Sequence, residues 1–63
     1  MAEIDTANCQ LVSKHSMGVV IQAPKRIMHP DEALVHAAWL ICMAEAVGTT
    51  HQFAEVLKAV QNT

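Results

Sequence analysis

Residues 31–48 read DEALVHAAWLICMAEAVG, and this stretch decides the fold. Between Ala33 and Val47 the only polar side chains are those of His36 and Glu45. A helix that is apolar on all sides has to be covered on all sides. The first question that the sequence raises is therefore what covers such a helix in so short a chain.

Signals at both ends predict that this helix runs over residues 30–47. Pro30 suits the first helical position, because its ring fixes a backbone angle that the helix needs. Asp31 and Glu32 bring negative charge to the positive end of the helix dipole. Gly48 follows the last apolar residue and is typical of a helix stop.

The segment before the helix favours a β-hairpin over residues 9–23. CQLVSK (9–14) and GVVIQA (18–23) are both rich in residues that favour strands, and Ser-Met-Gly between them can turn the chain. Pro24 ends the second strand or places it at a sheet edge. An isolated hairpin is barely stable in water, so we expect its apolar face to lie on the helix.

A second helix is predicted over residues 50–61. Thr49 and Gln52 match the capping-box pattern, with Thr49 as the cap and Gln52 reaching back to it. One side of this helix is apolar, at the spacing of helical turns. The apolar positions are Phe53, Val56, Leu57 and Val60. The sequence thus predicts an α+β domain, a hairpin followed by two antiparallel helices joined by a short link.

The hairpin and the second helix cover two sides of the first helix, and a third side is left. We therefore expect a homodimer or a higher oligomer in which this helix packs against a second copy. The alternative is that the helix is a central core helix and that some apolar surface stays exposed. The predicted oligomer interface consists of Leu34, Ala38, Trp39, Leu40, Ile41 and Met43.

The composition is that of one small folded domain, residues 9–63, after a flexible N-terminus, residues 1–8. The chain is 52% hydrophobic, which is too apolar for a disordered tail. Its net charge of −2 argues against binding of nucleic acid through a broad basic surface. Cys9 and Cys42 are too few for a disulfide framework. We expect a cytoplasmic protein, since neither a signal peptide nor a membrane-spanning stretch is apparent.

No catalytic, metal-binding or cofactor motif stands out, so we expect no enzyme, no metal and no cofactor. The four histidines have no standard zinc spacing, and the serines and cysteines have no signature context. The most suggestive polar cluster is Lys25, Arg26 and His29, between hairpin and helix. Thr49 and Thr50 offer a helix start of the kind that binds phosphate. These residues are the predicted contacts to a partner or a nucleotide-like anionic ligand.

Two resemblances suggest functions. A strand, a helix and a capped second helix resemble the ribbon-helix-helix repressors, which are obligate dimers whose paired strands enter the major groove. That resemblance implies DNA binding, but GVVIQA offers only Gln22 as a base-reading side chain, and Pro24 interrupts it.

The stretches EALVHAAWLICMAEAVG and FAEVLKAVQNT resemble small accessory proteins encoded by bacteriophages and prophages, over the C-terminal half of the chain. This second resemblance implies a viral protein that blocks or sequesters a host factor. We accordingly expect a non-enzymatic inhibitor that acts as a homo-oligomer on a host defence or regulatory protein or on a small anionic ligand. The alternative is a dimeric DNA-binding repressor.

Overall fold

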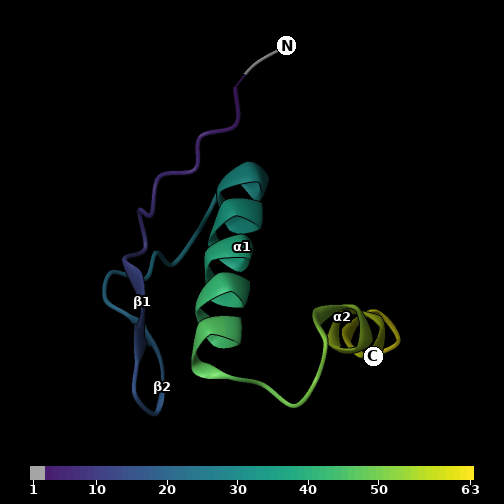
Figure 1. Cartoon of the computed structure of the whole chain (residues 1–63). Helices are drawn as coiled ribbons and strands as arrows, with labels where there is room; N and C mark the ends of the chain where they lie inside the picture. The colour runs from purple at the N-terminus through teal and green to yellow at the C-terminus, as the bar shows by residue number, and fades with distance from the viewer. Residues whose placement is uncertain (1–2) are drawn as a thin grey trace.

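The computed structural model describes residues 3–63, whose elements follow the predicted order (Figure 1). An antiparallel hairpin of strands β1 (Val12–His15) and β2 (Gly18–Ile21) comes first. The helices α1 (Pro30–Val47) and α2 (Phe53–Gln61) follow it. The predicted α+β fold is therefore confirmed.

The two strands of the hairpin pair with each other inside one chain. Val12 lies opposite Ile21 and His15 lies opposite Gly18, so Ser16 and Met17 alone make the turn. The strands are shorter than the predicted 9–14 and 18–23. Backbone bonds from residues 22 and 23 to residues 11 and 10, both 3.3 Å long, continue the pairing beyond them.

Asn8 fixes the turn that leads into β1. Its side-chain amide donates to the Val12 carbonyl and its side-chain oxygen accepts from the Val12 N–H, both at 2.9 Å. Leu11, inside this turn, has a φ of 48°, in the left-handed region that an L-residue with a side chain rarely adopts. The Leu11 N–H also donates to the Asn8 carbonyl at 3.0 Å. Asn8 therefore holds a backbone conformation that leucine by itself disfavours.

The bounds of α1 are those that the sequence predicts. Pro30 occupies the first turn, and Gly48 ends the helix with a φ of 121° while its N–H donates to the Ala44 carbonyl at 2.9 Å. Only glycine adopts such a φ without strain. One side of α1 packs against both strands, as Figure 1 shows. The Trp39 indole N–H also donates to the Thr6 carbonyl at 3.0 Å, which ties the extended N-terminal residues to α1.

The start of α2 corrects the prediction of a helix over residues 50–61 capped by Thr49. The helix begins at Phe53, and the Gln52 N–H donates to the Glu55 carboxylate at 3.0 Å, which satisfies a free amide at the helix start. The Thr49 hydroxyl does not cap the helix. It accepts a hydrogen bond from the His51 N–H at 3.2 Å, within the link that precedes the helix. Thr49 therefore stabilises the turn before α2 instead of the helix.

The two helices do not form the antiparallel pair that we expected. Residues 48–52 leave α1 as an extended link, and α2 lies on the side of α1 away from the hairpin, at a steep angle to it (Figure 1). Within the described residues, α2 makes no contact with another element comparable to that between α1 and the strands. A short link is compatible with antiparallel helices, but the backbone of this link directs α2 outward.

Few side chains are buried within one chain. Among the described residues only Val12, 2% exposed, and Gln10, 4% exposed, count as buried. Neither helix contains a buried residue. The interior of a single chain is thus a thin layer between the hairpin and one side of α1.

Val12→Ala should lower the free energy of unfolding by about 2 kcal/mol, because it removes two methyl groups from the most buried apolar side chain. Val20→Ala is the matched control, since Val20 is exposed on the neighbouring strand. Chemical denaturation of both variants measures the difference. Equal losses for the two variants would contradict the assignment of Val12 to the interior.

Candidate interaction surfaces

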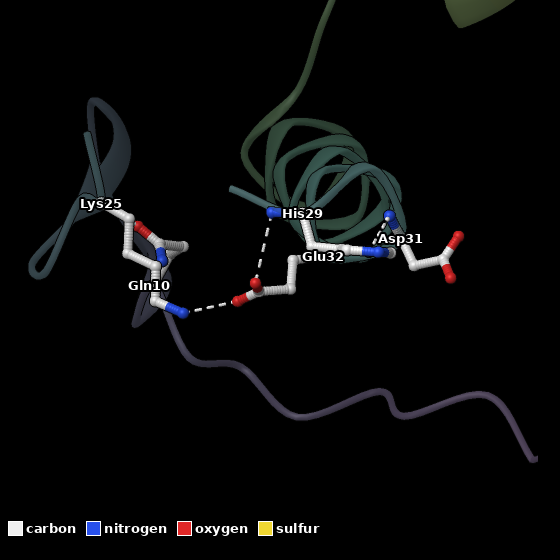
Figure 2. A network of polar contacts seen from close by, with 5 residues as sticks. All are labelled: Gln10, Lys25, His29, Asp31 and Glu32. Carbon is white, nitrogen blue, oxygen red and sulfur yellow. Dashed lines mark hydrogen bonds and ion pairs between the residues drawn. The ribbon is translucent and has the colours of Figure 1, made fainter. Parts of the chain in front are cut away.

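The connector between β2 and α1 forms a polar network with the start of α1 (Figure 2). The Lys25 ammonium forms an ion pair with the Glu32 carboxylate at 2.5 Å. The Lys25 backbone N–H donates to the side-chain oxygen of the buried Gln10 at 2.6 Å. Lys25 is therefore held at both its backbone and its side chain, and its charge is partnered within the chain.

His29 belongs to the same network as the cap of α1. Its Nδ1 accepts from the Asp31 N–H at 3.2 Å, and its own N–H donates to the Glu32 carboxylate at 3.3 Å. The His29 side chain is therefore engaged in capping α1. The predicted cluster of Lys25, Arg26 and His29 thus contains less free positive charge than its sequence suggests.

The ion pair shifts the titration of both of its members. The hydrogen bond from Lys25 and the backbone hydrogen bond from His29 lower the pKa of Glu32 below its ordinary value. The hydrogen bond to Glu32 and the attraction of its charge raise the pKa of Lys25. Both side chains are nearly half exposed, so the pair contributes little to stability by itself.

Arg26 is the free cation of the connector. It is exposed, and among residues 3–63 it forms neither a side-chain hydrogen bond nor an ion pair. Lys14 is exposed on β1 and likewise forms neither a side-chain hydrogen bond nor an ion pair among these residues. Of the basic residues in the N-terminal half, these two present charge to an external ligand.

Thr49 and Thr50 lie at the opposite end of α1 from Lys25, Arg26 and His29. An 18-residue helix separates the two groups, and a helix of that length spans about 27 Å. One chain therefore does not bring the predicted anion contacts together. The Thr49 hydroxyl is also bonded to the His51 backbone, and α2 begins four residues after Thr49, at Phe53.

The six residues of the predicted oligomer interface divide between two sides of α1. Leu34, 71% exposed, and Ala38 lie on the side that faces solvent. Leu40 and Met43 are half-buried and lie on the other side of the helix, toward the hairpin. The remaining two, Trp39 and Ile41, are half-buried and flank the exposed side.

The apolar side of α2 is uncovered over its whole length. Phe53 is 50% exposed and Val60 is 64% exposed, and no residue of this helix is even half-buried. The whole chain exposes 5464 Å². A compact monomer of 6.9 kDa exposes about 4,000 Å². The chain therefore exposes about 1,500 Å² more than a compact monomer of its mass, with contributions from α2 and from the extended N-terminal residues.

The described residues contain little that resembles a reactive centre. Ser16 Oγ lies 3.4 Å from His15 Nδ1, but the two are exposed neighbours in the hairpin turn. Cys9 and Cys42 are both free and exposed. No group of three or more metal-ligating side chains forms in the described part of the chain.

Sequence reasoning missed three polar residues that the structure singles out. Histidine is an uncommon helix cap, so the role of His29 gave no signal. Asparagine near a strand does suggest a turn, and Asn8 could have been found in that way. The buried Nδ1 of His36 has no hydrogen-bond partner within the part of the chain that the structure describes. Nothing in the spacing of the histidines distinguishes it.

In the part of the chain that the structure describes, neither helix combines the length and the apolar character needed to cross a membrane. Comparison with known proteins gives no match to a family model, to a curated protein or to a solved structure.

Glu32→Gln should remove a stabilising effect that is present only when Glu32 is charged. A lowered pKa means that Glu32 stabilises the fold above its ordinary pKa and that this stability is lost as the pH falls through the lowered value. Thermal unfolding of wild type and variant, from neutral to acidic pH, measures it. We expect a slightly lower Tm for the variant at neutral pH and convergence in acid. A constant difference across the range would contradict the ion pair.

Proposed function

We propose that the chain is a small non-enzymatic binding protein that acts as a homo-oligomer in the cytoplasm. Its activity is to sequester a host protein or a small anionic ligand, as phage-encoded inhibitors do. The observation that carries this proposal is the set of large apolar side chains that α1 and α2 leave exposed. An enzyme needs a cleft that aligns reactive groups, whereas this chain offers exposed helix faces and an exposed connector.

The oligomer follows from the size of the uncovered surface. A chain of 63 residues has little interior of its own. The excess of about 1,500 Å² per chain, to which α2 and the extended N-terminal residues both contribute, sets an upper bound of about 3,000 Å² on what two chains bury in this way, and obligate homodimers bury about 2,000 Å² or more. Oligomerisation therefore supplies the interior that a single chain lacks.

The partner or ligand is expected to bind at the surface that remains outside the helices. This surface consists of the hairpin and the connector, where Lys14 and Arg26 form no ion pair with any of residues 3–63. Lys25 is a weaker candidate, because releasing it for a ligand breaks its ion pair with Glu32. Arg26 is thus the side chain that we expect to contribute most to binding.

The DNA-binding alternative has less support. A ribbon-helix-helix protein pairs one strand from each of two chains, whereas β1 and β2 pair within a single chain. The net charge of −2 also opposes binding to a phosphate backbone.

Arg26→Glu should abolish binding, and Lys58→Glu on α2 is the matched control because it changes the charge by the same amount. The tagged proteins are compared by capture from a bacterial lysate and by thermal shift with nucleotides and inorganic phosphate. We expect a stoichiometric protein or a stabilising anion with wild type and Lys58→Glu, and loss of at least tenfold in affinity with Arg26→Glu. Identical results for all three proteins, in both assays, would contradict the proposal.

Duplex DNA should not bind to the protein at low salt, as measured by fluorescence anisotropy. Binding that weakens steeply as salt rises, and that Lys25→Ala/Arg26→Ala removes, would instead favour the repressor alternative.

A further inference from the structure

Two apolar surfaces in this chain are uncovered and similar in length. The α2 stripe consists of Phe53, Val56, Leu57 and Val60, all exposed. The open face of α1 runs from Leu34 through Ala38 to Cys42, all exposed as well. At the rise of an α-helix, the α2 stripe is about 11 Å long and the open face is about 12 Å long.

The α2 helix needs a surface to pack on. It has 9 residues, and isolated helices shorter than about 12 residues are marginal in water. Most helical stability in proteins comes from packing of an apolar side. The α2 stripe has no partner among the described residues of its own chain, so the surface has to come from elsewhere.

The link between the helices disfavours the open face of the same chain. The Gly48 N–H donates to the Ala44 carbonyl at 2.9 Å, and the Thr49 hydroxyl accepts from the His51 N–H at 3.2 Å. These bonds hold residues 48–52 in the shape that carries α2 away from α1 (Figure 1). An antiparallel return onto the same α1 requires this link to change its backbone.

A second copy satisfies both surfaces at once. Each chain offers one stripe and one open face, so two chains related by a two-fold axis cover all four surfaces and leave none to continue the assembly. The surface excess of about 1,500 Å² per chain, part of which lies on α2 and part on the extended N-terminal residues, is large enough to include the area that such a dimer covers.

We propose that the α2 stripe of each chain packs on the open face of α1 in a second copy, so that the dimer exchanges its C-terminal helices. This inference rests on the homo-oligomer of the proposed function and adds the two surfaces that meet. It makes Cys42 a neighbour of the partner's α2 stripe.

Disulfide trapping tests the exchange in a Cys9→Ser background. One chain keeps Cys42, and a second carries Cys42→Ser with Val56→Cys. After the two are unfolded and refolded together, mild oxidation should link them into a covalent heterodimer, detected by intact mass. The matched control replaces Val56→Cys with Lys58→Cys on the opposite side of α2, and should give at most a tenth of that product.

A single chain with both Cys42 and Val56→Cys decides between exchange and closure on the same chain. Exchange predicts a covalent dimer with two bonds, whereas an internal bond within a monomer would overturn the proposal. Light scattering on the reduced protein shows whether the exchange alone is wrong or the homo-oligomer is wrong as well. A dimer that yields no bond between Cys42 and position 56 would overturn the exchange alone, and a monomer would also overturn the homo-oligomer.

Discussion

The constraint on which the structure depends is that a single chain, over the residues that the structure describes, does not cover its own helices. The hairpin covers one side of α1, and α2 leaves the other side open. The apolar residues of both helices therefore remain in contact with water unless another molecule packs on them. A nine-residue helix and a small interior are each marginally stable in that state, which is why we propose that association and folding are linked.

Most polar contacts of the connector lie within the chain and stabilise the fold. His29 caps α1, Glu32 pairs with Lys25, and Gln10 holds the backbone of Lys25 in place. These contacts fix where the hairpin meets the start of α1. Among the described residues they leave Arg26 free, so the proposed binding can be tested by mutation at that position with little effect on the fold.

Local signals made α1 predictable, and the lack of local signals explains the errors. Pro30 and Gly48 act on the backbone beside them, and the helix begins and ends where they indicate. Thr49 and Gln52 match the capping-box pattern and predicted a helix start that is wrong, because Gln52 and Glu55 form the cap instead and glutamine is not a cap residue in that pattern. The placement of α2 depends on the backbone angles of residues 48–52, which no periodicity encodes. The same limit applies to the predicted site, since its two halves proved to lie at opposite ends of α1.

The measurement that tests the central claim most directly is the mass in solution, by light scattering coupled to size exclusion over a tenfold dilution. A self-associating chain predicts a mass at least twice the 6.9 kDa of one chain, maintained on dilution. A folded species of 6.9 kDa at every concentration would contradict the claim. The open faces of α1 and α2 would then be the surface that binds a different protein.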